Sequence, residues 1–196
     1  MKKFLRQKNM KGFTLIEALV AVSIFTGAIL GMMGVLSNNL ADINYAKRKV
    51  IATYLAQEGV EYFRNMRDTF VLYEGQSVNG WDNFLVKIND CEKTQGSLGC
   101  YFRDEMDYTN NDSPITGNLM GVVACLNGVC PELKYNASLG SYSYTGLTDA
   151  GFTRKINTVQ INDHEIQVIS TVSWTHAGRS SSVSFSDNLF NWQRGI

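Results

Sequence analysis

The sequence predicts an α+β fold in which one long N-terminal helix packs on a C-terminal antiparallel β-sheet. An uninterrupted apolar run begins at Phe13, apolar residues recur at helical spacing after Ile51, and polar and apolar residues alternate in the last third of the chain. We expect a basic leader at residues 1–12, a membrane-spanning helix at 13–36, an amphipathic continuation of that helix at 37–67, and a β-rich globular domain at 68–196.

The leader and the apolar run predict a single membrane span with the N-terminus in the cytoplasm. The run from Phe13 to Leu36 has 24 residues, and about 20 suffice to cross a bilayer. Positive flanks stay on the cytoplasmic side, and the leader holds five cations and no acid: Lys2, Lys3, Arg6, Lys8 and Lys11. A secretory signal would have a shorter apolar core followed by its cleavage site. Cleavage before the run is therefore favoured, and an uncleaved anchor is the alternative.

Glu17 is the one charged residue inside the apolar run. A carboxylate at the centre of a bilayer costs about 2.5–3.5 kcal/mol, and less near the interface. Either a function retains Glu17, or a protonated acid is tolerated there because the N-terminus of a helix favours negative charge.

The residues from Gly12 to Glu17 read Gly-Phe-Thr-Leu-Ile-Glu, which resembles the N-terminus of type IV prepilins and the related pseudopilins. The resemblance implies that a prepilin peptidase cleaves between Gly12 and Phe13 and that Phe13 becomes an N-methylated mature N-terminus. It also implies that Glu17, the fifth mature residue, acts in assembly by neutralising the N-terminal amine of a neighbouring subunit.

The helix is predicted to run from about Phe13 to about Arg67. Its second half carries an apolar stripe that should pack against the sheet, formed by Ile51, Leu55, Gly59, Tyr62 and Met66. Its first half contains Gly27, Gly31 and Gly34. These glycines allow close approach of another helix, mark a stretch that softens inside a filament, or reflect the ordinary frequency of glycine in membrane helices.

The middle of the chain predicts short elements. They are a buried element around residues 81–88, a strand at 121–125, a tight turn at Asn127-Gly128, and short strands at 133–135 and 142–144. Tyr135, Tyr142 and Tyr144 form either an adhesive surface or part of the core. The acidic stretch from Asp104 to Asp112 is expected to be a solvated loop, with calcium binding as the alternative.

The last third predicts an antiparallel meander. Strands are expected at 152–161, at 166–174 and around Val183 and Phe185, joined by turns at Asn162-Asp163 and Ala177-Gly178. Leu189, Phe190 and Trp192 are expected to close the chain against the core. This region, and the helical stretch 52–61, resemble the minor pilins called pilus modification proteins.

Four cysteines, Cys91, Cys100, Cys125 and Cys130, lie in the part expected to be exported. Export favours disulfides, and four cysteines allow three connectivities. We favour the local pairs Cys91–Cys100 and Cys125–Cys130, which close short loops. A zinc site is the alternative, although the spacing is unusual for zinc and no histidine is near. We predict no metal and no cofactor.

The composition argues against an enzyme and against a nucleic-acid-binding surface. His164 and His176, the only histidines, each lie beside a predicted turn, and no phosphate-binding loop, nucleophile elbow or zinc helix occurs. Without the leader the chain has 13 cations and 18 acids, which disfavours a polyanionic partner.

We therefore expect a minor structural subunit of a type IV pilus-like filament. Its partners would be other pilin subunits, the prepilin peptidase, the assembly platform of the inner membrane, and the membrane itself through one helix. The precursor would lie in the cytoplasmic membrane and the mature subunit in an extracellular pilus or a periplasmic pseudopilus. The alternatives are the major pilin, a minor pseudopilin of a type II secretion or DNA-uptake system, and a membrane-anchored adhesive domain that is not cleaved at Gly12.

Overall fold

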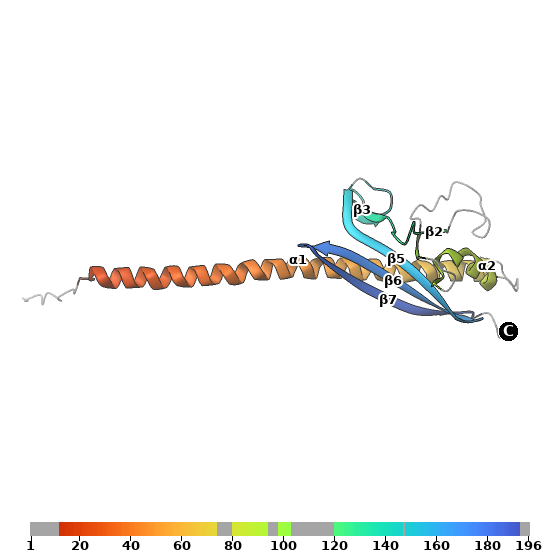
Figure 1. Cartoon of the computed structure of the whole chain (residues 1–196), viewed down its shortest axis with the longest axis horizontal. Helices are drawn as coiled ribbons and strands as arrows, with labels where there is room; N and C mark the ends of the chain where they lie inside the picture. The colour runs from red at the N-terminus through yellow and green to blue at the C-terminus, as the bar shows by residue number, and fades with distance from the viewer. Residues whose placement is uncertain (1–11, 74–79, 94–97, 103–119, 147, 193–196) are drawn as a thin grey trace, which may run out of the picture. The chain divides into compact units, whose positions relative to one another are not determined.

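The computed structural model describes residues 12–73, 80–93, 98–102, 120–146 and 148–192 (Figure 1). It confirms the predicted α+β class, with a long helix that is apolar in its first part and an antiparallel sheet of seven strands. The chain divides into two compact units, Met1–Ala46 and Lys47–Ile196. The acidic stretch from Asp104 to Asp112 lies outside the described residues.

Helix α1 (Leu15–Tyr73) contains 59 residues. It extends beyond the predicted end at Arg67 because the apolar face continues there: Phe70 and Val71 are both 1 % exposed. Two short helices follow, α2 (Gly80–Lys87) and η1 (Asn89–Cys91). The buried element expected at residues 81–88 is thus a helix, and the indole of Trp81 donates a hydrogen bond of 2.9 Å to the carbonyl oxygen of Asp163.

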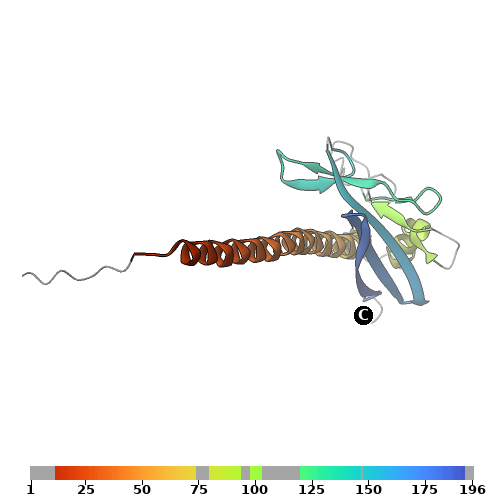
Figure 2. The same ribbon diagram turned by 60° about the vertical axis from the view of Figure 1, so that its left-hand side comes forward.

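Strand β5 is the centre of the sheet. It pairs with β6 along one edge and with β1 and β3 along the other, and every pairing between strands is antiparallel (Figure 2). β2, β4 and β7 extend the sheet from β1, β3 and β6. The strands are β1 (Cys100–Phe102), β2 (Val122–Ala124), β3 (Glu132–Asn136), β4 (Ser141–Ser143), β5 (Thr148–Asn162), β6 (Glu165–His176) and β7 (Arg179–Phe190).

The hairpin from β6 to β7 turns at Ala177-Gly178, as expected. Both residues have positive φ, 49° and 75°, which is the backbone geometry of a type I′ turn. The hairpin from β5 to β6 turns at residues 163–164, one residue later than expected. The sequence analysis missed β1, which is only three residues long.

Strict alternation along β6 gives the sheet an inner and an outer face. The inner face of β6 consists of Ile166, Val168, Ser170, Val172 and Trp174, which are all buried. The residues that alternate with these along β6 are half-buried or exposed and point to the opposite side of the sheet. We call that side the outer face. On β7 the same pairing places Leu189 on the inner face, directly opposite Ile166.

The expectation for the end of the chain was right for Leu189 and wrong for its neighbours. Leu189 is 1 % exposed, whereas Phe190 and Trp192 are 51 % and 50 % exposed. Phe190 follows Leu189 in the strand and therefore points to the outer face. Trp192 lies beyond the end of β7.

The helix buries a stripe that overlaps the predicted one and is rotated from it. Leu55, Gly59 and Met66 are buried as expected, while Ile51 and Tyr62 lie half-buried at its border. Further buried positions on this face include Ala52, Ala56, Val60, Phe63 and Phe70. These residues pack on the inner face of the sheet in two apolar clusters, one around Phe63 and Ile156 and one around Leu55 and Trp174.

Helix and sheet approach closely at Gly59. A Cβ added there would overlap the Oγ of Ser170 on β6 and lie 3.4 Å from the Cδ of Arg154 on β5. The glycine is therefore required by packing, since any larger residue would push the helix from the sheet.

Arg154 is the largest fully buried side chain and lies on the inner face of β5. Its Nη1 donates to Glu58 Oε2 at 2.6 Å and to the carbonyl oxygen of Leu55 at 3.3 Å. Its guanidinium also lies 3.9 Å from the ring centre of Phe102. Because a buried charge is costly without partners, these contacts hold α1, β1 and β5 in one arrangement.

A second ionic contact joins the same helix to β7. Arg64 bonds to Asp187, and this hydrogen bond raises the pKa of Arg64. Both side chains are more than a third exposed, so the pair adds little stability. The pair nevertheless holds Asp187, which faces inward from the edge strand β7, against α1.

Both disulfides are local, which fits the favoured pairing. Cys91–Cys100 joins η1 to β1 inside the larger apolar cluster, and both cysteines are fully buried. Cys125–Cys130 closes the turn at Asn127-Gly128, where φ is 51° and 78°.

We expect Gly59→Ala to destabilise the sheet domain. Overpacking of this kind costs about 1–3 kcal/mol, and about 1 kcal/mol of gained helix propensity offsets part of it. Thermal unfolding of the detergent-solubilised chain should show a lower Tm. Adding Ser170→Ala should recover part of the loss, because the overlapping Oγ is then absent. Gly34→Ala is the control, since no atom lies within 4 Å of its added Cβ. An unchanged Tm for Gly59→Ala would contradict the close approach.

We expect the paired substitution of Cys91 and Cys100 by Ala to lower the free energy of unfolding by about 2–3 kcal/mol in the loop-entropy account. Non-reducing peptide mapping should recover the Cys91–Cys100 and Cys125–Cys130 peptides. A peptide linking Cys91 to Cys130, or four free thiols, would show that the pairing is wrong.

Candidate functional site

The candidate site is the stretch from Gly12 to Glu17, together with the apolar helix that follows it. Gly12 and Phe13 are exposed and lie outside regular structure, since α1 begins at Leu15. A peptidase needs an accessible, unwound backbone, which a helix would first have to open to provide. The Gly12–Phe13 bond meets this requirement.

No contact among the described residues requires a glycine at position 12. A Cβ added to Gly12 would have no atom within 4 Å, and its φ is not in the left-handed region. If glycine is required at position 12, the requirement therefore comes from another molecule that binds the chain there.

Thr14 and Glu17 form the start of the helix. The carbonyl oxygen of Thr14 accepts hydrogen bonds from the backbone N–H groups of Glu17 and Ala18, at 3.1 and 3.2 Å. The Thr14 hydroxyl lies 3.5 Å from Glu17 Oε2. The order Thr-x-x-Glu is that of a capping box, and a carboxylate in the first turn interacts favourably with the helix dipole.

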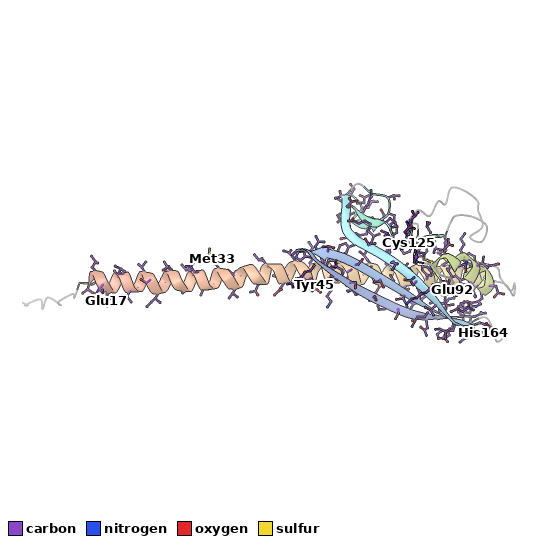
Figure 3. The ribbon with its side chains drawn as sticks, viewed as in Figure 1. Glu17, Met33, Tyr45, Glu92, Cys125 and His164 are labelled. Carbon is purple, nitrogen blue, oxygen red and sulfur yellow. A yellow bond between two sulfur atoms is a disulfide. The ribbon has the colours of Figure 1, made fainter. Side chains whose placement is uncertain are left out.

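This local role leaves the carboxylate of Glu17 without a cation among the described residues. Its one side-chain contact there, at 3.5 Å from a neutral hydroxyl, is at the limit of a hydrogen bond. Figure 3 shows Glu17 and Met33 projecting outward from α1. A cation that pairs with Glu17 therefore does not come from the residues that the structure describes.

Residues Leu15–Leu36 form the one helical segment of the described chain that is long and apolar enough to cross a membrane, and none of it is buried within the chain. Its large side chains are exposed all round, for example Leu15 at 83 % and Met33 at 63 %. A helix that is apolar on every side needs to be covered by lipid or by other helices.

Polar side chains inside this segment are satisfied by their own helix. Ser23 Oγ donates to the carbonyl oxygen of Leu19 at 2.6 Å, and Thr26 Oγ1 donates to that of Val22 at 2.9 Å. Such bonds let hydroxyls enter an apolar environment without an unpaired donor.

No described residue packs against the three glycines of the segment. A Cβ added at Gly27, Gly31 or Gly34 has no atom within 4 Å. All three interpretations given by the sequence therefore stay open, and any packing role would involve another molecule.

The tyrosines of the globular domain belong partly to its core. Tyr142 and Tyr144 are half-buried and pack against the cluster around Leu55 and Trp174. Tyr135 is 37 % exposed and its ring lies 5.0 Å from that of Tyr142. Among the described residues no group of three His, Cys, Asp or Glu side chains could hold a metal.

Sequence reasoning missed Arg154 and its partner Glu58. The signal was present, because Arg154 occupies an inward position in the alternation Phe152, Arg154, Ile156 of β5. A buried cation at such a position predicts an anionic partner on the packed element, and that partner, Glu58, is itself half exposed.

The first part of the chain, residues 7–35, matches the family model described as the prokaryotic N-terminal methylation motif. No curated protein and no solved structure matches the chain. The matched residues include the Gly12–Phe13 junction, Glu17 and most of the exposed apolar helix. The motif is a type IV pilin-like prepilin signal, and together with the apolar helix it fits a membrane-anchored precursor. The chain thus carries the N-terminal signal of a type IV pilin-like or pseudopilin precursor.

Proposed function

We propose that this protein is a minor structural subunit of a type IV pilus-like filament, cleaved after Gly12 and assembled through its N-terminal helix. The observation that carries the proposal is the helix Leu15–Leu36, which is exposed on every side and holds one carboxylate near its start. Lipid covers such a helix before assembly, and neighbouring helices cover it in a filament.

Cleavage between Gly12 and Phe13 removes all the cations of the leader and creates a new one. The amine of Phe13 becomes the mature N-terminus, and the peptidase then methylates it. Gly12 is the residue that the peptidase reads, which accounts for a glycine that no contact within the described chain requires.

Glu17 provides the partner for that amine in a neighbouring subunit. In an apolar bundle each charge would be unpaired without the other, and removing one partner of a buried pair costs about 3–5 kcal/mol. An incoming subunit reaches this pairing at only one axial position, so the pair fixes its register. The same charge is tolerable in the free subunit because it lies in the first turn of the helix.

The globular unit supplies the surface of the filament. We place the subunit among minor pilins on the likeness of residues 52–61 and of the β5–β7 meander to pilus modification proteins. A major pilin would dominate sheared filaments in amount. A pseudopilin would be needed for secretion or DNA uptake while surface fibres persist. An adhesive membrane anchor would retain its leader.

We expect Gly12→Val to block processing without affecting membrane insertion or folding of the globular unit. A branched side chain has room in the chain itself, because nothing lies within 4 Å of the added Cβ, so only the peptidase should reject it. Immunoblots of membranes should show the slower-migrating precursor alone. Normal cleavage of Gly12→Val would contradict recognition of this glycine.

We expect Glu17→Ala to be processed, inserted and folded normally but to be absent from filaments, because the neighbour's amine loses its partner in an apolar core. Glu17→Gln should also fail, since it keeps the shape and the hydrogen-bonding groups but cannot neutralise the amine. The measurement is the ratio of processed subunit in sheared filaments to that in membranes, in cells lacking the wild-type copy.

Thr14→Ala is the matched control for this experiment. It removes the hydroxyl that contacts Glu17 at the helix start and keeps the carboxylate, so filaments should contain it at near wild-type levels. Wild-type incorporation of Glu17→Ala would show that this carboxylate does not direct assembly.

A further inference from the structure

The outer face of the sheet is hollowed where β3, β5, β6 and β7 run side by side. The hollow is a groove of about 260 Å³. Five polar side chains contribute to its lining, from all four strands: Glu132, Thr153, Ser173, Thr175 and Ser180. All belong to the globular unit. The groove is also lined by Gly151 and Trp174, and Trp174 belongs to the apolar cluster between the sheet and α1.

The strand register brings these side chains together. Glu132 lies directly opposite Thr153, and Thr153 lies directly opposite Ser173, so the three form one row across β3, β5 and β6. Thr175 and Ser180 lie opposite each other in the next row, on β6 and β7. Directly paired residues have Cβ atoms about 4.5–5.5 Å apart, which is close enough for one small molecule to contact several of them.

A β-bulge shapes the groove and orients its carboxylate. The register between β3 and β5 shifts after Leu133, because Phe152 pairs with Leu133 and Asp149 with Lys134. Gly151 lies in the shifted segment with φ +74°, and its N–H donates a hydrogen bond of 2.6 Å to Glu132 Oε1. Bulges bend a strand locally, and this one also supplies the backbone N–H that fixes the Glu132 carboxylate beside Gly151.

Strand propensity does not explain the hydroxyls on β7. Its outer face carries serine at every second position, Ser180, Ser182, Ser184 and Ser186. Serine is not among the residues enriched in strands. Lysine, proline and inward-pointing charges protect edge strands from unwanted pairing. β7 contains no lysine or proline, and Asp187 is its inward-pointing charge. Strand propensity therefore does not account for the serine hydroxyls on the outer face of β7.

We propose that this groove binds a neutral saccharide. Each Ser or Thr hydroxyl is both a donor and an acceptor, whereas an ionised Glu132 only accepts. A matching ligand has many O–H donors. Glu132 would repel a carboxylate or phosphate placed beside it. Among the described residues, the cation beside the lining is Arg48, whose Nη1 would lie 3.3 Å from a Cβ added to Gly151. The volume lies just below the range of about 300–1,000 Å³ typical of drug-sized ligands. It therefore suits one or two sugar units, with the open groove letting a longer chain continue past it.

The site is independent of filament assembly, and its test uses the full chain in a detergent without a sugar headgroup. Cellotetraose, maltotetraose, tetra-N-acetylchitotetraose and tetragalacturonate are each titrated by calorimetry. We expect at least one neutral probe to bind and tetragalacturonate not to bind. Failure of all three neutral probes, or a preference for tetragalacturonate, would overturn the proposal.

Substitutions then locate the binding. Glu132→Ala and Thr175→Val should each weaken the neutral probe at least tenfold. Glu132→Gln should keep binding of the neutral probe within a fewfold and admit tetragalacturonate, because it retains an acceptor and removes the charge. Ser186→Ala is the matched control, on the same face of β7 but outside the groove, and should bind like the wild type. Equal affinities for Glu132→Ala and the wild type would place the binding elsewhere.

Discussion

The globular unit depends on the close approach of α1 to the sheet at Gly59. The absence of a side chain there lets Ser170 of β6 reach the helix, and Arg154 of β5 fills the space beside it with a buried guanidinium. Arg154 is held by Glu58 and by the carbonyl oxygen of Leu55, one turn apart on the helix. An apolar side chain at 154 could slide along the helix face, whereas a charge with fixed partners allows one register. The two apolar clusters on either side of this contact are arranged by it.

The first half of α1 shows the opposite situation. Over Leu15–Leu36 none of the helix is buried, no atom of the described residues lies within 4 Å of a Cβ added at its glycines, and its carboxylate contacts only the hydroxyl of Thr14 among those residues. Such an exposed apolar helix is unfavourable in water, so lipid or another protein must cover its surface. The two parts of this helix therefore lie in different environments. The sheet covers the apolar face of the C-terminal part, and lipid or other subunits must cover the apolar surface of the N-terminal part. The methylation motif, residues 7–35, includes most of this exposed apolar segment.

Features that depend on a short stretch of sequence could be predicted from the sequence. Features that depend on contacts between distant residues could not. The prepilin junction, the strands β5 to β7 and the turn at Ala177-Gly178 each follow from a short stretch of sequence. Strand β1 has three residues, too few for any period to appear, and Phe84, Leu85 and Val86 form an apolar run that fits a helix or a strand equally. The partners of Arg154 and the saccharide groove depend on residues far apart in sequence. The groove depends on a bulge at Gly151 that only the pairing of β3 with β5 reveals.

We propose that the exposed helix is the start of a subunit that is first processed and then assembled. Intact-mass analysis of the protein isolated from its native membranes can decide this. We expect a chain that starts at Phe13, carries one additional methyl group and retains both disulfides. A chain that retains Met1–Gly12 in membranes with an active prepilin peptidase would contradict it, and would leave α1 as an ordinary membrane anchor.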